Sequence, residues 1–206
     1  MRLLYPILFA AIFLPLAVAF LMQSGQTTAE EHSGLFERVV PVCYPPGREP
    51  AAYDFQLVDQ YGRQIRLSEL WSSPVLVTFT YTYCPDVCPT MHFVLNKTLP
   101  LVKGVVSHVL DVSLDPQRDS VDRLRAYALG NRYNWTFLTG DEKTLEAVWR
   151  AYGVYRAVET RNGQPYIVHD VVWVVVKDGK ILGVVRGLTA PDTLADYVKK
   201  FVARQC

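Results

Sequence analysis

The sequence predicts an α/β fold in which a central mixed β-sheet is flanked by helices. Strand-like and helix-like segments alternate through the middle of the chain, two β-branched runs then form a hairpin, and a helical segment closes the sequence. Two cysteines stand directly after the first apolar core strand. This order of elements, with paired cysteines at that place, is typical of a thioredoxin-like domain.

The predicted domain begins with a small hairpin and a buried strand. Residues 55–58 alternate between apolar and polar, the chain turns at Tyr61-Gly62, and the pattern resumes at residues 64–67. Residues 75–81 form a short apolar run. A run of this length and composition indicates a strand that is buried on both faces.

The next elements alternate between helix and strand. Residues 89–103 carry apolar side chains at helical spacing, and residues 105–114 are typical of a β-strand. Ser120 can cap a helix that runs through Gly130, because its hydroxyl can accept a hydrogen bond from the first helical turn. Residues 135–138 are predicted to form a short strand.

The C-terminal part is predicted to contain a helix, a hairpin and a closing helix. Asp141 can cap a helix that ends near Gly153. Residues 166–176 and 180–186 are two β-branched runs, and Lys177-Asp178-Gly179 between them is a strong hairpin signal. The closing helix carries its apolar side chains on one face: Leu194, Tyr197, Val198 and Phe201.

The beginning of the chain is predicted to be an export or anchoring segment. Residues 3–22 are almost wholly apolar, and Arg2 precedes them. About 20 apolar residues match the hydrocarbon thickness of a bilayer, which favours a retained transmembrane helix over a cleaved signal peptide. Ala17-Val18-Ala19 leaves cleavage open as the alternative. With Arg2 on the cytoplasmic side, the domain would lie outside the cytoplasm.

The chain is therefore expected to have three parts. Residues 1–23 would be the membrane anchor or signal peptide, residues 24–50 a linker, and residues 51–206 one thioredoxin-like domain of ordinary size. The formal net charge of +1 comes from 21 basic and 20 acidic residues without a basic cluster. This charge pattern argues against nucleic acid as a partner.

The cysteine pair lies in the run Cys84-Pro85-Asp86-Val87-Cys88-Pro89, where the predicted strand turns into a helix. A helix N-terminus presents unpaired N–H groups and the positive end of its dipole, which favour thiolate over thiol for both cysteines. Positions four apart share one helix face, with Cβ atoms roughly 5 to 6 Å apart. Two such sulfurs can bind one soft metal ion or form a disulfide, so the motif predicts either a metal site or a redox pair.

A third candidate for this site is His169. It lies in the predicted strand 166–176, which should run close to the cysteine turn. The alternative is an ordinary core or edge histidine. His92, on the predicted helix, and His108, on a predicted strand, show no partner pattern, and His32 falls in the linker.

Cys43 and Cys206 flank the predicted domain. An extracytoplasmic location allows disulfides to persist, and a disulfide between these two residues would close nearly the whole domain. The alternative is that Cys206 is a free tail residue and Cys43 a small buried apolar one. The sequence leaves both interpretations open.

Further motifs resemble those of one family over nearly the whole chain. They accompany a single apolar N-terminal segment and comprise Tyr83 to Pro89, Val112 to Pro116 with Asp119 behind it, Phe137 to Gly140, and Tyr166 ahead of His169. Together they resemble the Sco (SenC/PrrC-like) copper chaperones, which are associated with assembly of the CuA centre of cytochrome c oxidase.

The resemblance implies a copper ligand set and two partners. In that family the two motif cysteines and the later histidine bind copper, and the matching positions here are Cys84, Cys88 and His169. Two thiolates and an imidazole suit Cu(I), and Cu(II) could be held with added ligands. The implied partners are the oxidase subunit that bears the CuA site and a copper donor protein. This sequence departs from the family in having Val168 before the histidine and Asp170 after it.

Three aspartates near these motifs are predicted to have structural roles, as hydrogen-bond acceptors for backbone N–H groups in turns and at a helix start. Asp86 should accept N–H hydrogen bonds in the cysteine turn, and Asp115 and Asp119 are predicted to be turn and helix-start residues. A carboxylate close to a bound metal is the second interpretation for each of them.

Two enzymatic alternatives stay open beside the chaperone, which needs no catalytic turnover. A thiol-disulfide oxidoreductase would reduce a partner's cysteines with Cys84 as the attacking thiol and Cys88 as its redox partner. Peroxide reduction on the same fold would need a threonine and an arginine near the reacting sulfur. Thr82 and Thr90 are available, but no arginine lies near the motif in the sequence.

Overall fold

The central strand β4 (Val75–Thr80) is buried along its whole length. Strand β5 (His108–Ser113) pairs with it in parallel on one side, and β9 (Val172–Lys177) pairs antiparallel on the other. The sheet that results has eight strands in the order β1-β10-β9-β4-β5-β6-β2-β3. This arrangement confirms the predicted α/β class with a central mixed sheet.

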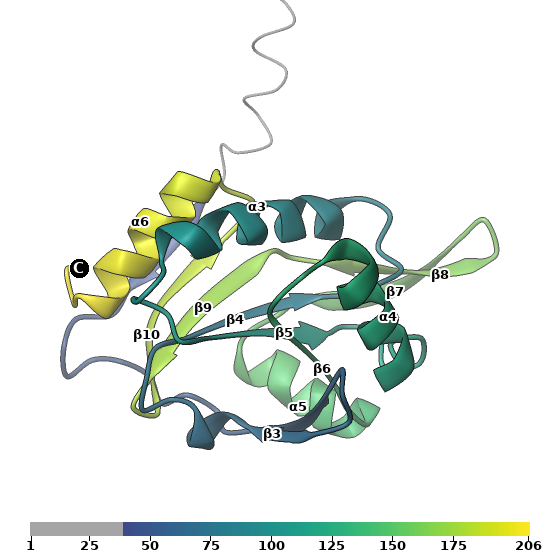
Figure 1. The fold of residues 1–206 in the computed structure, drawn as a ribbon, viewed down its shortest axis with the longest axis horizontal. Helices are drawn as coiled ribbons and strands as arrows, with labels where there is room; N and C mark the ends of the chain where they lie inside the picture. The colour runs from purple at the N-terminus through teal and green to yellow at the C-terminus, as the bar shows by residue number, and fades with distance from the viewer. Residues whose placement is uncertain (1–38) are drawn as a thin grey trace, which may run out of the picture. The chain divides into compact units, whose positions relative to one another are not determined.

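The computed structural model describes residues 39–206 (Figure 1). Its other elements are β1 (Val40–Cys43), β2 (Gln56–Asp59), β3 (Gln64–Arg66), η1 (Leu67–Glu69), α3 (Val87–Leu101), α4 (Val121–Asn131), β6 (Thr136–Thr139), α5 (Glu142–Ala151), β7 (Arg156–Arg161), β8 (Gln164–His169), β10 (Lys180–Arg186) and α6 (Pro191–Val202). Over this part of the chain, no helix has the length and apolar character that a membrane span requires. The predicted anchor at residues 1–23 lies outside the described residues, as does the linker up to residue 38.

Both faces of the sheet are covered, which produces two apolar clusters. On one face, α3, α4 and α6 pack on side chains that include Leu76 and Trp173. On the other face, α5 and the β2–β3 hairpin pack on Val75, Val77 and Phe79. Adjacent residues of β4 belong to opposite clusters because successive side chains of a strand point to opposite faces. Figure 1 shows α3 and α6 together on one side of the sheet and α5 on the other.

The predicted helix caps at Ser120 and Asp141 are confirmed. The Ser120 side chain accepts a hydrogen bond from the backbone N–H of Arg123 at the start of α4 (3.2 Å). Asp141 accepts from the N–H of Thr144 at the start of α5 (2.9 Å). Both side chains satisfy N–H groups that would otherwise have no partner in the first helical turn.

The strand predicted at residues 166–176 is wrong in one respect, because the chain forms two strands there. β8 ends at His169 and β9 begins at Val172. β8 pairs with β7 in a separate two-stranded sheet, which projects from the body as an arm (Figure 1). The polar, exposed segment β7 lacks the apolar alternation that indicates a strand. The overlooked signal is Asn162-Gly163, whose positive φ angles of 51° and 74° form the turn of this hairpin.

Residues 40–43, which the sequence analysis placed in the linker, form the edge strand β1 instead. β1 pairs antiparallel with β10, and α6 packs on β10. This packing brings Cys43 and Cys206 together in a disulfide with a Cα–Cα distance of 5.3 Å. Of the two interpretations of these cysteines, the structure confirms the disulfide that closes nearly the whole domain.

Replacing both Cys43 and Cys206 by Ser should lower the free energy of unfolding by about 2–5 kcal/mol, because a cross-link over a long loop restricts the unfolded chain. Urea unfolding followed by near-UV circular dichroism measures the change. A phosphine reductant should destabilise the unmodified protein and leave the double variant unaffected. Equal unfolding midpoints for the two proteins without reductant would contradict the prediction.

A second prediction concerns the contact between β10 and α6. A Cβ atom at Gly183 would lie 2.4 to 2.6 Å from ring carbons of Phe201. Gly183→Ala should therefore lower the free energy of unfolding by about 1–3 kcal/mol. Gly130→Ala is the matched control, since nothing lies within 4 Å of that Cβ and alanine favours the helix. Urea midpoints that move equally in the two variants would show that Gly183 is not confined by Phe201.

Candidate metal centre

The junction between β4 and α3 places both cysteines at a helix N-terminus, as predicted. Asp86 is the residue before the helix, and its carboxylate accepts a hydrogen bond from the N–H of Val87. Cys88 lies in the first turn and is fully buried, while Cys84 is 8% exposed. The N–H of Cys88 donates to Cys84 Sγ at 3.3 Å. One sulfur is therefore close to the surface and the other lies beneath it.

Strand β8 brings His169 to the two cysteines. His169 Nε2 lies 3.3 Å from Cys88 Sγ, and potential ligand atoms of all three residues lie within 4.8 Å of one another. His169 Nδ1 lies 2.9 Å from the backbone carbonyl of Asp170. Because a carbonyl only accepts hydrogen bonds, Nδ1 carries a proton, and Nε2 is the ring nitrogen that faces the sulfurs. A histidine ligand needs this ring orientation, and Nε2 can bind a metal whenever it carries no proton.

The two cysteines differ in acidity. Hydrogen bonds from Cys88, from His169 and from the N–H groups of Asp86 and Cys88 outweigh burial and lower the pKa of Cys84 to about 5. For Cys88, burial is the largest effect, and the neighbouring Cys84 adds to it, so the pKa is raised. The expectation that the helix N-terminus favours thiolate holds for Cys84 and is wrong for Cys88. The reduced pair therefore carries one negative charge, on Cys84, at neutral pH.

Two tyrosines connect the arm that carries His169 to the cysteine loop. The hydroxyl of Tyr81 donates to the carbonyl of Ile167 (3.1 Å) and accepts from its N–H (3.3 Å). The hydroxyl of Tyr166 donates to the carboxylate of Asp86. The ring of Tyr81 also meets the His169 ring edge to face, with the ring centroids 5.8 Å apart. The sequence did not reveal that Tyr81 holds the arm in this way, because its pattern predicts only the last residue of a core strand.

Asp170 supports the histidine from the position after it. Its backbone carbonyl is the hydrogen-bond partner of the imidazole, as described above. Its carboxylate accepts from the N–H of Tyr155 (2.9 Å) and pairs with Arg186 of β10 (2.6 Å). The acidic residue that follows the histidine in this chain therefore fixes the end of β8 against the body of the domain.

The buried carboxylate of Asp119 anchors the start of the cysteine loop from the protein interior. Asp119 accepts hydrogen bonds from the hydroxyls of Thr82 and Ser113 (both 2.6 Å) and from the N–H of Thr82 (3.2 Å). Burial outweighs these hydrogen bonds and raises the pKa of Asp119 to about 6. The prediction that Asp119 starts the next helix is wrong, because Ser120 caps that helix and Asp119 points inward.

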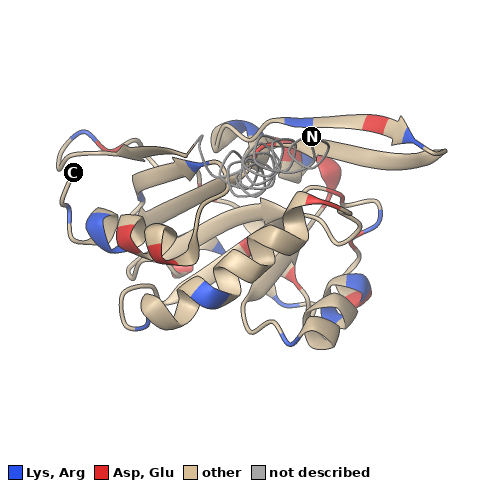
Figure 2. Ribbon diagram, turned by 90° about the horizontal axis from the view of Figure 1, so that it is seen from above, with Lys and Arg blue, Asp and Glu red and all other residues tan. Residues whose placement is uncertain are grey.

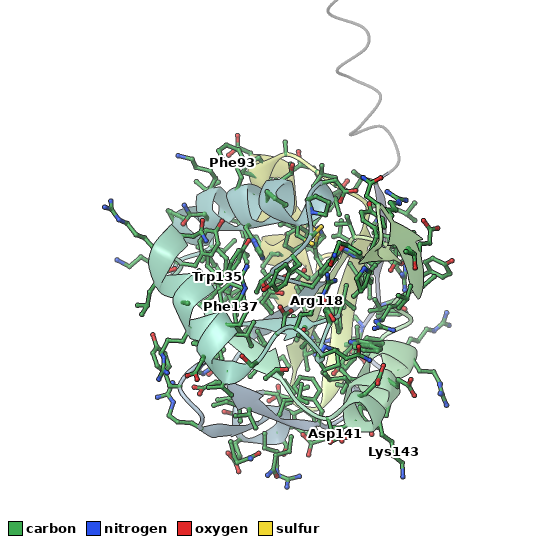
Figure 3. All side chains as sticks on the ribbon, turned by 90° about the vertical axis from the view of Figure 1, so that its right-hand side faces the viewer. Phe93, Arg118, Trp135, Phe137, Asp141 and Lys143 are labelled. Atoms are coloured by element: carbon green, nitrogen blue, oxygen red, sulfur yellow. A yellow bond between two sulfur atoms is a disulfide. The ribbon has the colours of Figure 1, made fainter. Side chains whose placement is uncertain are left out.

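Arginines that are distant in sequence approach the cysteine motif in space. Arg123 Nε donates to the hydroxyl of Thr82 (2.9 Å), and Arg118 pairs with Asp115. The guanidinium groups of Arg118 and Arg123 lie 5.0 and 4.4 Å from the centroid of the Tyr83 ring. Figure 3 looks onto this face of the molecule, with Arg118 near its middle. No local sequence signal predicts this convergence.

His92 belongs to the core. Its Nε2 lies 2.9 Å from Asp111 and 3.1 Å from the Thr80 hydroxyl, and its Nδ1 lies 3.0 Å from the Tyr127 hydroxyl. These partners satisfy both ring nitrogens, so His92 is not free to bind a metal. His108 is exposed at the start of β5. Neither residue belongs to the cluster of Cys84, Cys88 and His169.

The comparison with known protein families identifies the chain. The family model described as SCO1/SenC matches residues 45–203. The chain belongs to the SCO1/SenC family. The match includes the cysteine motif and the arm that carries His169, so the resemblance inferred from the motifs is confirmed.

Individual relatives support this assignment. The SCO2-like protein of Rickettsia felis is 33% identical over 109 residues, which are 50% of this chain and 52% of that protein. The mitochondrial SCO2 homologue of Bos taurus is 27% identical over 160 residues, which are 73% of this chain and 59% of that protein. The chain thus spans between half and three fifths of the length of these two relatives.

Solved structures of relatives have the same fold. ScoI of Bradyrhizobium japonicum with copper bound is 28% identical, with a TM-score of 0.63 over 74% of this chain and 99% of that one. Arabidopsis thaliana ScoI with copper bound has a TM-score of 0.69 over 75% of this chain and 99% of that one, and at 24% identity it supports the thioredoxin-like fold. Relatives therefore hold copper on this fold, and the present chain has a Cys-Cys-His cluster that could bind a metal.

In the reduced, metal-free protein, Cys84 should react with iodoacetamide at neutral pH, and its rate should fall to half near pH 5, because the thiolate is the nucleophile and its pKa is about 5. Timed alkylation read by peptide mass spectrometry measures the profile. Cys88→Ala should move the midpoint to higher pH, since it removes the hydrogen bond that lowers the pKa of Cys84 most. A midpoint near that of a free cysteine, about 8.5, would contradict the prediction.

Tyr81→Phe should speed hydrogen exchange at the Ile167 amide, because the variant keeps the ring and loses the hydroxyl that accepts from this N–H. Exchange measured by mass spectrometry on peptides covering residues 164–170 tests this. Tyr61→Phe is the control, since Tyr61 is half exposed in the β2–β3 turn. Unchanged exchange in Tyr81→Phe would show that other contacts hold the arm.

Proposed function

We propose that this protein is a membrane-tethered copper chaperone that binds one copper ion through Cys84, Cys88 and His169. The observation that carries the proposal is the convergence of the three ligand atoms within 4.8 Å of one another, although His169 lies on a separate hairpin. The orientation of the imidazole supports it, since the hydrogen bond at Nδ1 leaves Nε2 for a metal.

The chemistry of the cluster favours copper. Two sulfur ligands and one imidazole form a soft set of three, which suits Cu(I), and Cu(II) could be held with added ligands. Structural zinc sites have four protein ligands. Cys88 is fully buried while Cys84 and His169 reach toward the surface, so a partner could approach the ion from one side. This arrangement suits a copper ion that is transferred to a partner protein.

The proposed recipient is the subunit of cytochrome c oxidase that bears the CuA site, and a copper donor protein would load the chaperone. BsSco, a solved relative of 23% identity with a TM-score of 0.61, is described as a member of the Sco family of cytochrome c oxidase assembly proteins. Family membership of the present chain supports the same role. The apolar residues 3–22 support a tether that would hold the domain on the extracytoplasmic side of the membrane.

Thiol-disulfide exchange is the second candidate, because Cys84 combines a low pKa with a neighbouring second thiol. The Cys84 thiolate would attack a partner disulfide and release one partner thiolate. Cys88 would then lose its proton and displace the second partner sulfur, which leaves a reduced partner and a disulfide between Cys84 and Cys88. The burial that raises the pKa of Cys88 slows this second step.

Anaerobic titration of the reduced protein with Cu(I), in competition with a chelator, tests the proposal. One tight equivalent is expected. Cys84→Ser and Cys88→Ser should abolish tight binding, and His169→Ala should weaken Cu(I) binding and disturb Cu(II) binding most. His108→Ala is the control because its imidazole is exposed and outside the cluster.

Two outcomes would contradict the chaperone proposal. Equal copper affinity in the wild type and all three ligand variants would exclude this ligand set. If copper affinity were unchanged in His169→Ala while reduction of a disulfide substrate were lost, the protein would act as the oxidoreductase instead.

A further inference from the structure

A groove of about 570 Å³ opens beside the candidate metal centre. The cysteine loop, with Tyr83 and Asp86, forms one wall, and the β7–β8 arm, with Arg161 and Tyr166, forms the other. Asp86 lies between the two cysteines in sequence, and Tyr166 lies on the strand that ends at His169. A molecule seated in the groove would therefore lie next to the cluster.

Two guanidinium groups and one carboxylate line the groove. The carboxylate in its lining, Asp86, is already hydrogen bonded to Val87 and Tyr166. Arg161 pairs with Glu159 at 3.1 Å, but both side chains are 52% exposed, so water and salt weaken this pair. Arg161, the last residue of β7, thus presents a guanidinium group that stacks on the Tyr166 ring, with Cζ 3.4 Å from the ring centroid, and that can exchange Glu159 for a stronger partner.

Arg118 supplies the second positive charge. Its Nε donates to Asp115, whereas its Nη2 is buried and has no hydrogen-bond partner among residues 39–206. A buried donor without a partner costs free energy, and the Arg118 side chain, which is 23% exposed, would recover it by turning Nη2 toward an acceptor in the groove. Arg118 lines the groove and lies near the middle of the face seen in Figure 3.

An exposed aromatic side chain completes this surface. Tyr83 is 50% exposed, although Arg118 and Arg123 stack on its ring. Tyrosine and arginine are among the residue types enriched at the positions that contribute most to binding in protein interfaces. Figure 2 shows that acidic and basic residues are otherwise mixed over the ribbon, in keeping with the net charge of +1. Two arginine side chains therefore meet at the ring of Tyr83, next to the cysteine loop.

We propose that this groove binds an acidic segment of the protein that exchanges copper with the Cys84–Cys88–His169 cluster. The proposal rests on the chaperone function, since it assigns a chemical class to the partner in that transfer. Carboxylates of the segment would pair with the planar guanidinium groups, which favour bidentate contacts. Such contacts speed encounter and fix the register of two surfaces, and here they would bring the partner's metal ligands close to His169 and Cys84.

Binding of fluorescein-labelled octaglutamate to the metal-free, reduced full chain in detergent tests the proposal by fluorescence anisotropy at low salt. Arg161→Gln should weaken binding about fivefold, and Arg161→Glu should weaken it further, because each removes an exposed charge contact. Arg118→Gln should also weaken binding. Arg66→Gln on β3 is the matched control, since Arg66 is 47% exposed, pairs with an aspartate and does not line the groove.

Three results would overturn the proposal. One is the absence of octaglutamate binding to the wild type, and another is equal binding by Arg161→Gln and Arg66→Gln. The third is binding of octalysine as tightly as octaglutamate, which would show that charge complementarity is not the cause. Arg161 lies in the exposed arm, so its variants stay informative even if Arg118→Gln fails to fold.

Cu(I) titration of the same variants separates this proposal from the function on which it rests. Arg161→Gln should bind copper as tightly as the wild type, because Arg161 is not a member of the cluster. Failure of the wild type to bind Cu(I) would overturn the chaperone function whatever the peptide does. Normal Cu(I) binding together with octaglutamate binding that does not depend on Arg161 would overturn the groove proposal alone.

Discussion

The hydrogen bonds between the Tyr81 hydroxyl and the backbone of Ile167 join the two structural parts of the candidate metal centre. The cysteines belong to the main sheet and its helix, whereas His169 belongs to a hairpin that shares no ladder with that sheet. The position of the histidine therefore depends on side-chain contacts made by Tyr81, Tyr166 and Asp170. Hydrogen bonds are directional, and those of Tyr81 are buried, so together these contacts set the distance and the orientation of the imidazole.

Hydrogen bonds to the buried carboxylate of Asp119 fix the inner side of the cysteine loop. Burying the Asp119 carboxylate is unfavourable, as the rise in its pKa shows, and the hydrogen bonds from Thr82 and Ser113 offset part of that cost. The same two effects, burial and hydrogen bonding, decide which cysteine is charged. Hydrogen bonding favours the thiolate of Cys84, whereas burial favours the thiol of Cys88. A soft cation that binds both sulfurs would displace the remaining proton, so metal binding and proton release are coupled.

Transfer of a metal requires a site that is shaped in advance and still accessible. The interior contacts of Tyr81 and Asp119 provide the shape, while the half-buried His169 and the 8% of Cys84 that is exposed provide the access. The groove between the cysteine loop and the arm extends the same surface. Both walls of the groove carry residues that also organise the cluster, Asp86 on one side and Tyr166 on the other. A partner seated there would contact the elements that hold the ligands.

The sequence by itself determined the α/β class, the helix caps at Ser120 and Asp141, and the placement of both cysteines at a strand-to-helix junction. These features follow from local periodicity and from side chains that interact with nearby backbone. Only the tertiary structure decided the disulfide between Cys43 and Cys206, the approach of Arg118 and Arg123 to Tyr83, the inward turn of Asp119 and the break that makes β8 part of an arm. Each of these depends on contacts between segments far apart in the chain, and no local pattern of residues specifies which distant segment will be the neighbour.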